Sequence, residues 1–334
     1  MAVLSHNEPF PYLKLAGLSF AAFLAIMTET VPAGLLLDMS QDFGTSTGTI
    51  GQFLTAYAVG SVVAAIPVMT ATRAVPRRKL LIIAVLFLAV FNAVTAMTNI
   101  VLIGYISRFV AGMAGGVVWG LVANYARSLV SEGEQGKALG FIGFGQPIAL
   151  AFGVPLGSWG GSIVGWRAVF FALSIIAVGL AMWICVTVPP RPGDRDGDSS
   201  LGLLTKVISR NGVVFVLFSL LGWVCAHNIL YTYMSPFVEG VEASVNLNVS
   251  LLVFGVAAGT GIVVTTMVVD RHLYAASITC GLLFFLGLAV LAFFSGSAIA
   301  FLIGLILWGL GFGGAPTVLQ TALALRAGQY ADLA

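Results

Sequence analysis

Charge is what this sequence has least of. Only 8% of its 334 residues are Asp, Glu, Lys or Arg, whereas 59% are hydrophobic and the mean hydropathy is +1.03. A soluble domain carries roughly 25% charged residues, because charges cover the surface that faces water. We therefore expect lipid to be the solvent around most of this chain. The formal net charge of +2 gives no indication of a nucleic-acid partner.

Cysteine is scarce as well, and the residue patterns of known catalytic sites are lacking. Cys185, Cys225 and Cys280 lie in apolar runs without metal-ligand spacing, so we interpret them as small packing residues and expect no disulfides. The sequence contains no phosphate-binding P-loop, no HExxH pattern and no nucleophile elbow. We predict neither an enzyme nor a bound cofactor or metal. The first apolar stretch is too long for a cleavable signal peptide.

Long apolar stretches, separated by short polar ones, make up most of the sequence. A helix that crosses a bilayer needs about 20 mostly apolar residues. Ten stretches satisfy this requirement, at residues 13–37, 49–71, 79–98, 100–123, 136–160, 166–188, 211–236, 246–269, 273–295 and 298–325. The 40 glycines are compatible with helices here, because glycine lets membrane helices approach closely. The sequence thus predicts an all-α polytopic membrane protein.

Basic residues fall mostly on one side of this helical array. That side carries Lys14, Arg73, Arg77, Arg78, Lys79, Arg127, Lys137, Arg191, Arg195, Lys206, Arg210, Arg271 and Arg326. The opposite loops carry Asp38, Asp42, Glu239 and Glu242, with Arg167 as their one basic residue. Because basic loops tend to stay in the cytoplasm, we predict that the N-terminus is cytoplasmic.

The longest polar stretch divides the chain into two parts. Residues 189–210 contain PPRPGDRDGDSS and predict a cytoplasmic linker. The linker separates an N-terminal bundle of six helices, at residues 1–188, from a C-terminal bundle of four helices at residues 211–334.

The two halves resemble each other in sequence. Tyr57–Gly60 matches Phe254–Ala257, and Gly112–Gly116 matches Leu310–Gly314, both at an offset near 197–198 residues. Parallel repeats of six helices are a known plan of membrane transporters. On that plan the second half is two helices short, and the sequence leaves open whether the chain is a fragment or is naturally reduced.

Two charged residues lie well inside predicted spans, where they are costly. Glu29 lies in the first span and Arg108 in the fourth, each roughly 12 Å below the outer surface at 1.5 Å per helical residue. A common depth predicts an ion pair or a shared polar cavity. We interpret Glu29 as a proton-carrying carboxylate whose state responds to Arg108 and to substrate. The alternative is a fixed ion pair that holds two helices together.

Other polar or helix-bending residues lie in several spans. Pro32 removes a helix hydrogen bond and predicts a kink after Glu29. His227 lies at a depth similar to that of Glu29 and either binds substrate or relays protons, or is a hydrogen-bonded packing histidine. The predicted residues of the substrate cavity are Tyr57, Trp119, Asn124, Gln146, His227, Asn228 and Tyr231.

Several short segments form recognisable motifs. They are Thr28–Leu36 around the embedded acid, Arg77 and Arg78 after the second span, Arg108 and Gly112 in the fourth, Gly153, Pro155 and Gly157 in the fifth, and Gly165–Arg167 before the sixth. Together they resemble the major facilitator superfamily over nearly the whole chain. Within it they resemble the drug:proton antiporter branch and its bacterial sugar- and arabinose-efflux-like members. The resemblance implies a plan of twelve helices and alternating access of the two halves.

Two motifs depart from that family pattern. Arg73 replaces the acid that normally precedes the arginine pair by four residues, while Asp270 and Arg271 retain an acid–arginine pairing later in the chain. A valine, Val154, separates the glycine and proline of the fifth-span motif. The gating and motif residues implied by the resemblance are Pro32, Arg77, Arg78, Gly112, Gly153, Pro155, Gly157, Asp270 and Arg271.

The resemblance also implies a function. It implies a proton-coupled transporter in the inner membrane of a bacterium that exports a small organic solute, either a sugar-like compound or a drug, with Glu29 as the coupling acid and Arg108 as its modulator. We expect substrate, protons and the lipid bilayer to be the partners of a monomer. Two alternatives stay open: a non-transporting scaffold or sensor, and an uptake permease of the same fold.

Overall fold

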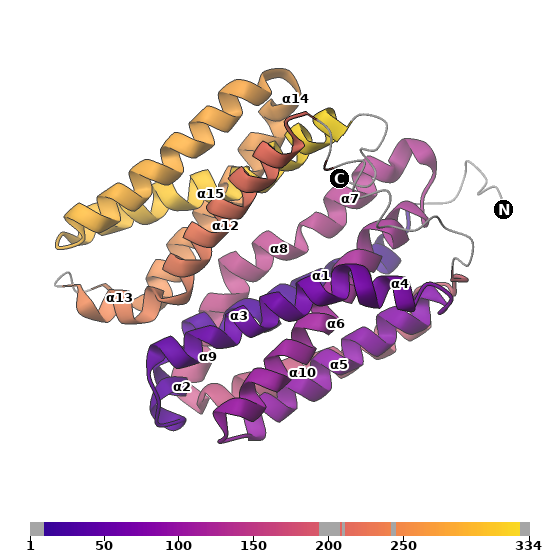
Figure 1. Ribbon diagram of the computed structural model, residues 1–334, viewed down its shortest axis with the longest axis horizontal. Helices are drawn as coiled ribbons and strands as arrows, with labels where there is room; N and C mark the ends of the chain where they lie inside the picture. Colours follow the sequence, from indigo (N-terminus) through magenta and orange to yellow (C-terminus); the bar gives the residue numbers. More distant parts are fainter. Residues whose placement is uncertain (1–9, 194–207, 209–210, 242–244, 328–334) are drawn as a thin grey trace. The chain divides into compact units, whose positions relative to one another are not determined.

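The computed structural model describes residues 10–193, 208, 211–241 and 245–327, and the regular structure in these ranges is helical (Figure 1). The all-α fold class is therefore confirmed. Most of the predicted linker at 189–210 lies outside the described residues, as do Arg195, Lys206, Arg210 and Glu242.

The described chain divides into two compact units. The first comprises Met1–Ala149 and Leu156–Asp196, and the second comprises Leu150–Pro155 and Gly197–Ala334. The longer elements up to the end of the first unit are α1 (Tyr12–Gly34), α2 (Leu36–Asp42), α3 (Thr47–Val63), α5 (Arg77–Met97), α6 (Val101–Arg127), α7 (Gln135–Gly143), α9 (Val154–Val164) and α10 (Trp166–Thr187). Shorter elements between them are η1 (Ala64–Val68), α4 (Met69–Ala71), η2 (Glu132–Glu134), α8 (Gly145–Ile148) and η3 (Ala149–Gly153). The second unit contains α12 (Val213–Thr232), α13 (Met234–Gly240), α14 (Leu247–Phe294) and α15 (Ala298–Ala327).

Each of the ten predicted spans corresponds to a helical segment of the described chain, although only 8 helices are by themselves long and apolar enough to cross a membrane. One of the predicted spans without a full-length helix contains α3. This helix ends after 17 residues, where the π-helical turn η1 begins, and Pro67 lies inside that turn. The other is α14, whose 48 residues extend about 72 Å at 1.5 Å per residue, enough for two spans. Its backbone leaves the helical conformation at His272, between the two predicted spans.

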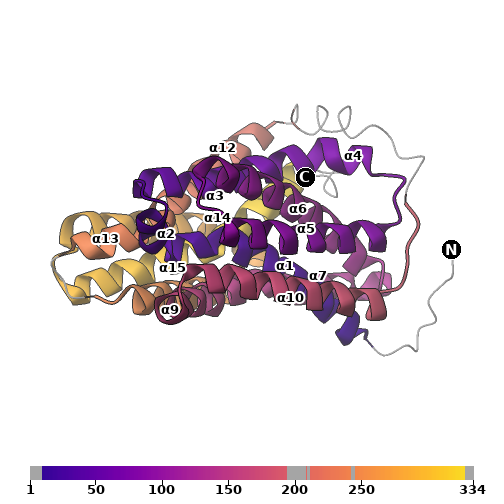
Figure 2. The same cartoon turned by 90° about the horizontal axis from the view of Figure 1, so that it is seen from below.

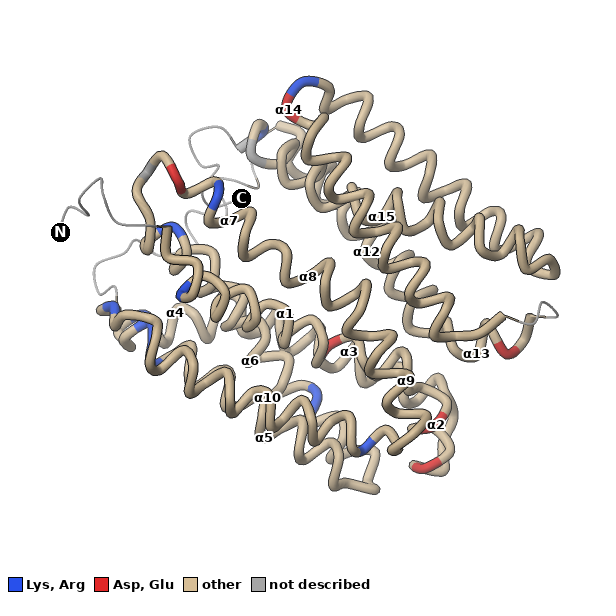
Figure 3. Tube along the Cα trace, turned by 180° about the vertical axis from the view of Figure 1, so that it is seen from behind, with Lys and Arg blue, Asp and Glu red and all other residues tan. Residues whose placement is uncertain are grey.

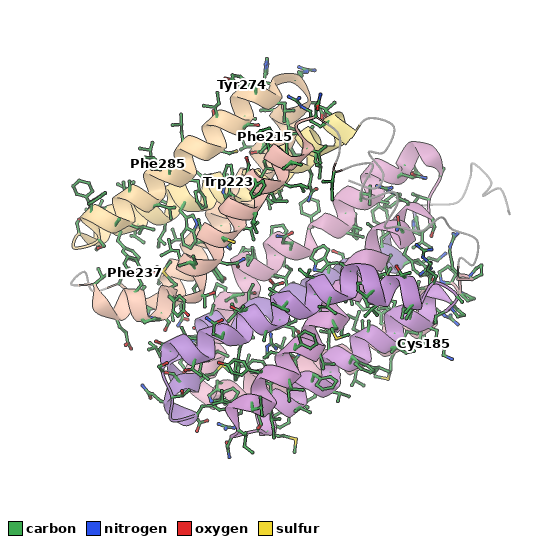
Figure 4. All side chains as sticks on the ribbon, viewed as in Figure 1. Cys185, Phe215, Trp223, Phe237, Tyr274 and Phe285 are labelled. Atoms are coloured by element: carbon green, nitrogen blue, oxygen red, sulfur yellow. The ribbon has the colours of Figure 1, made fainter. Side chains whose placement is uncertain are left out.

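Large apolar side chains cover the outside of both units. In Figure 4, Tyr274 and Phe285 project from α14 and Phe215 from α12, and these side chains are 81%, 67% and 79% exposed. An apolar exterior is stable in lipid rather than in water, so the composition and the surface both indicate a multi-pass membrane protein. Cys280 is buried, as expected of a packing residue, but Cys185 and Cys225 are exposed on this apolar surface, so for these two the packing interpretation is wrong.

Helix α1 occupies the centre of the first unit. It contacts α3, α5, α6, α7 and α10, and α5 and α10 run side by side along the same unit (Figure 2). Gly17, Ala21 and Ala25 follow one another at four-residue spacing along one face of α1, and small residues of this kind let neighbouring helices approach closely. Glu29 therefore lies on the most enclosed helix of the unit.

Helices α3 and α6 cross at very short range, and α14 and α15 repeat the crossing. A Cβ atom at Gly112 would overlap the carbonyl of Tyr57, and one at Gly116 would overlap that of Ser61. In the second unit, a Cβ at Gly309 would overlap the carbonyl of Phe254, and one at Gly313 that of Ala258. The four residues of the first crossing correspond one by one to the four residues of the second at an offset of 197, so the sequence repeat is also a structural repeat. The counterpart of Gly112 is Gly309 rather than Leu310.

Charged residues gather at the ends of the first unit. Figure 3 shows basic residues near the turn between α4 and α5, and acidic residues at α2, which are Asp38 and Asp42. At the basic end, Arg78 donates to the carbonyls of Cys185 (3.3 Å) and Val188 (3.1 Å). These carbonyls lie at the carboxyl end of α10, where helix carbonyls lack partners within the helix. At the other end, Asp42 forms an ion pair with Arg167 and accepts a hydrogen bond of 2.8 Å from Trp166 Nε1.

Candidate functional site

The sequence of α1 changes its backbone just beyond Glu29. Pro32 lies inside the last turn, α1 ends at Gly34, and α2 begins at Leu36. The Leu35 N–H bonds to the Pro32 carbonyl at 3.2 Å, and Ser158 donates to the Gly34 carbonyl at 2.9 Å. Pro32 offers no N–H to the Thr28 carbonyl four residues before it, whereas the carbonyls of Pro32 and Gly34 lose helical partners because α1 ends, and they are satisfied by these other groups. The predicted interruption after Glu29 is present as this break between two helices.

Arg108 is fully enclosed within the first unit, with no exposed surface. Its Nη2 donates to the carbonyl of Thr28, and its Nη1 donates to Asn92 Oδ1 at 3.3 Å. The guanidinium carbon also lies 5.1 Å from the ring centroid of Tyr57 and 5.7 Å from that of Phe170. Each of these partners is uncharged, so the cation is held by dipoles and aromatic faces.

Asn92 connects Arg108 to α1. Its Nδ2 donates to Thr28 Oγ1 at 3.0 Å while its Oδ1 accepts from Arg108. Because Arg108 also donates to the Thr28 carbonyl, the three residues form a closed ring of hydrogen bonds across α1, α5 and α6. All three have side chains with no exposed surface. The ring fixes the Arg108 guanidinium beside the backbone of Thr28, the residue before Glu29.

Glu29 differs from Arg108 in its surroundings. Its side chain is partly exposed, and among the described residues it forms no hydrogen bond and no ion pair. It is nevertheless close enough to interact electrostatically with Arg108 and Tyr57. Of the two predicted arrangements, an ion pair or a shared polar cavity, the ion pair is absent among the described residues.

Tyr57 completes this group on α3. Its hydroxyl donates to the Ala25 carbonyl on α1 at 3.1 Å, and it lies so close to Gly115 that a Cβ there would overlap the oxygen. We call Thr28, Glu29, Tyr57, Asn92 and Arg108 the polar cluster. It brings residues of four helices together, although the sequence had assigned Tyr57 to the substrate cavity rather than to the surroundings of Arg108.

A second group of side chains lies in the other unit. His227 and Tyr231 on α12, Phe254 on α14, and Trp308 and Phe312 on α15 form what we call the aromatic cluster. The His227 and Phe312 rings stack with centroids 3.4 Å apart, and those of Phe254 and Trp308 are 4.1 Å apart. His227 and Tyr231, two of the predicted cavity residues, are both buried and lie together, with ring centroids 5.3 Å apart.

The remaining predicted cavity residues lie outside both clusters. Asn124 and Trp119 are exposed on α6, and Asn228 and Gln146 are partly exposed on α12 and α8. None of the four makes a side-chain hydrogen bond within the described ranges, so their place in a substrate cavity stays a prediction.

Apart from Gly112, which lies inside α6 at the crossing with α3, the predicted gating residues lie near places where helices bend or end. Arg77 and Arg78 contact the chain after α10, where the Arg77 N–H bonds to the Arg191 carbonyl at 2.9 Å. Gly153 ends the π-helical segment η3, and Pro155 and Gly157 follow in α9. Asp270 and Arg271 are exposed beside the break in α14. Helix irregularities of this kind are frequent at functional sites.

Sequence reasoning missed Thr28, Asn92, Phe254 and Trp308. A signal for Asn92 existed, since it is the one amide in the apolar run of α5. Thr28 contributes mainly a backbone carbonyl, which no sequence pattern reveals. Phe254 and Trp308 are ordinary core residues by type, and only the helix packing brings them to His227.

Comparison with known proteins agrees with this architecture. The chain superposes on a bacterial homologue of the human lysosomal transporter Spinster with a TM-score of 0.70 at 16% identity, covering 98% of this chain and 80% of that chain. For the xylose transporter XylE from E. coli the TM-score is 0.68 at 16% identity, covering 97% and 90% of the two chains. For a D-xylose–proton symporter it is 0.67 at 18% identity, covering 96% and 84%.

These likenesses show the fold of secondary transporters. The sequence itself matches the family model of the Major Facilitator Superfamily over residues 18–332, which is nearly its whole length. With 8 helices among the described residues that are long and apolar enough to cross a membrane, an internal repeat and an embedded acid beside an enclosed arginine, the chain belongs to the Major Facilitator Superfamily.

Proposed function

We propose that this protein is a proton-coupled secondary transporter that exports a small organic solute by alternating access, in the inner membrane of a bacterium with its N-terminus in the cytoplasm. Residues 1–188 and 211–334 are its two moving bundles, joined by the linker at 189–210. Glu29 carries the proton and Arg108 sets how readily Glu29 releases it. The drug:proton antiporter branch is the part of the superfamily that its motifs resemble.

One observation carries the proposal: a cation enclosed in neutral partners lies beside a carboxylate that is not bound to it. A fixed ion pair would hold both charges permanently and leave Glu29 unable to exchange a proton. Here two of the three Arg108 nitrogens donate to Thr28 and Asn92, and the guanidinium lies against aromatic rings, so Glu29 stays free to bind a proton or substrate. Membrane-embedded acids of this kind mark ion pathways in transporters.

The direct test is solute transport in proteoliposomes under an imposed pH gradient. We expect the gradient to drive accumulation in the unaltered protein and not in Glu29→Gln, whose amide cannot exchange a proton at neutral pH. Glu239→Gln is the matched control, because Glu239 is an exposed carboxylate on α13 at the end of its helix bundle. Gradient-driven accumulation that is unchanged in Glu29→Gln would refute the coupling role of that residue.

Uptake is a second candidate function, favoured by the similarity to xylose–proton symporters. The two directions differ in the proton movement that follows addition of substrate to a weakly buffered suspension of right-side-out vesicles. If the protein is an antiporter, substrate that enters the vesicles is exchanged for protons that leave them, and the external pH falls. If it is a symporter, protons enter with the substrate, and the external pH rises. If the purified protein transports no solute in either direction, a scaffold or sensor role replaces both export and uptake.

A further inference from the structure

Pro32 removes one backbone hydrogen bond beside the polar cluster. In an α-helix each carbonyl accepts from the N–H four residues later, and for the Thr28 carbonyl that residue is Pro32, which has no N–H. A carbonyl without a partner is costly in a membrane-embedded helix, so it requires a donor from elsewhere. Arg108 Nη2 is that donor, and it comes from α6. The proline and the arginine thus act on the same oxygen atom, although they are far apart in sequence.

We propose that Pro32 is a positioning residue for Arg108. By leaving the Thr28 carbonyl without a helical donor, it provides the acceptor that holds the guanidinium away from the carboxylate of Glu29. Asn92 provides the second holding bond. This inference rests on the proposed coupling role of Glu29, and it explains how that acid is kept unpaired beside a cation.

Without these two bonds the cation would pair with Glu29. Arg108 Nε is buried and has no hydrogen-bond partner within the described part of the chain, so the guanidinium keeps a donor that a carboxylate could accept from. Glu29 directly follows Thr28 and is close enough to act on Arg108 electrostatically. Opposite charges at such range attract strongly in the protein interior. The directed bonds from Nη2 to Thr28 and from Nη1 to Asn92 oppose that attraction.

The aromatic contacts of Arg108 do not fix its position in the same way. The rings of Tyr57 and Phe170 have their centroids 5.1 Å and 5.7 Å from the guanidinium carbon, and a ring face attracts a cation over a broad range of positions. A hydrogen bond to a carbonyl weakens steeply as its angle closes, so it restricts the guanidinium far more. An N–H at residue 32 would give the Thr28 carbonyl a helical donor, and Arg108 would then compete for an acceptor already in use.

Asn92 holds the same arrangement from α5. Its Oδ1 accepts from Arg108 Nη1 at 3.3 Å, and its Nδ2 donates to Thr28 Oγ1 at 3.0 Å. The amide is therefore oriented by the same residue whose carbonyl binds Arg108. Because 3.3 Å is long for an N–H···O bond, the bond to the Thr28 carbonyl is the one whose loss should matter most.

The experiment measures how fast Glu29 reacts with dicyclohexylcarbodiimide, which modifies protonated carboxyl groups in apolar surroundings. The full chain is labelled in lipid nanodiscs at one fixed pH, and peptide mass spectrometry gives the modified fraction. Pro32→Ala restores the N–H, which frees Arg108 to pair with Glu29, and a carboxylate beside a cation keeps less of its proton. We expect labelling to slow about tenfold, the effect of one lost hydrogen bond. Asn92→Leu should slow it as well.

Pro316→Ala is the matched control. Pro316 also lies inside a spanning helix, but this helix is α15 of the second unit, which contains no residue of the polar cluster. Its replacement should leave the labelling of Glu29 unchanged. A second variant tests the cause: adding Arg108→Gln to Pro32→Ala removes the cation, so labelling should return to the rate of the unaltered protein. A proline that only shaped the helix would show no such recovery.

The results separate this inference from the proposed function. Unchanged labelling in Pro32→Ala, or slow labelling that Arg108→Gln does not restore, would overturn the positioning role of Pro32. Gradient-driven export that Glu29→Gln abolishes supports the proposed function whatever Pro32→Ala shows. If Glu29 of the unaltered protein does not react at all, it holds no exchangeable proton, and the coupling role falls together with this inference.

Discussion

The α3–α6 crossing of the first unit and the α14–α15 crossing of the second share a backbone and differ in chemistry. At the offset of 197 that relates the glycine contacts, Arg108 corresponds to Leu305 and Tyr57 to Phe254. Ala111 and Gly115, which leave room for Arg108 and the Tyr57 hydroxyl, correspond to the bulky Trp308 and Phe312. At these equivalent positions the first unit has small residues beside its buried charge, whereas the second unit has the large rings of its aromatic cluster.

The difference teaches that one duplicated scaffold accommodates two kinds of side-chain chemistry. The first unit surrounds a cation with neutral dipoles and leaves an acid beside it. In the second unit aromatic rings fill the equivalent space, and His227 Nδ1, Tyr231 Oη and Trp308 Nε1 have no hydrogen-bond partner within the described part of the chain. The glycines that bring the helices together are shared because close approach is required in both.

The strongest way to break the comparison is to place the charge in the wrong unit. Leu305→Arg puts a guanidinium at the position equivalent to Arg108, where the counterpart of Asn92 is Ala289 and offers no acceptor. We expect a loss of about 2.5–3.5 kcal/mol in stability, the insertion cost of an unpaired arginine. Thermal unfolding in detergent measures it, with Leu305→Met as the control for side-chain length. Equal melting temperatures for the two variants would show that the second unit tolerates the charge after all.

The equivalence of the two backbones is tested by alanine at matched glycines. Gly112→Ala and Gly309→Ala each place a methyl group against a carbonyl of the facing helix, so both should lose about 1–3 kcal/mol of stability. Gly179→Ala and Gly222→Ala serve as controls, since a Cβ at either position meets nothing within 4 Å. Unfolding by heat or denaturant reports the change. A strong effect at Gly112 with none at Gly309 would contradict a shared crossing.

The smallest expected effect sharpens the polar side of the comparison. Asn92→Leu removes the acceptor of Arg108 and the donor to Thr28 and should lower gradient-driven transport about tenfold, the effect of one buried hydrogen bond on the coupling group. Thr95→Val is the control, because Thr95 is equally buried one turn along α5 but bonds to Ser107 and the Phe91 carbonyl. If both variants lower stability and transport alike, Asn92 is only a packing residue.

The positions of the spans were predictable because a bilayer imposes a simple rule. A segment of about 20 apolar residues has to be helical to pair its backbone groups in lipid, whatever its neighbours are. For the same reason Glu29 and Arg108 stood out, since an ionisable residue in such a segment is rare. Even the offset of the repeat was nearly correct, although only the glycine contacts decided that Gly112 corresponds to Gly309.

The partners of these residues were decided by the tertiary structure alone. Arg108 is held by a ring of hydrogen bonds through Asn92 and the backbone of Thr28 instead of the ion pair that was one of the two predicted arrangements, because a residue pattern contains neither carbonyl positions nor rotamers. Cys185 and Cys225 face outward for a similar reason: helices this uniformly apolar carry little periodicity to show which face meets protein. By itself the sequence determined that this chain spans a membrane and where its buried charges lie. The packing of helices distant in sequence decided that Arg108 is held by neutral groups and that His227, Tyr231 and Trp308 keep unpaired atoms in one cluster.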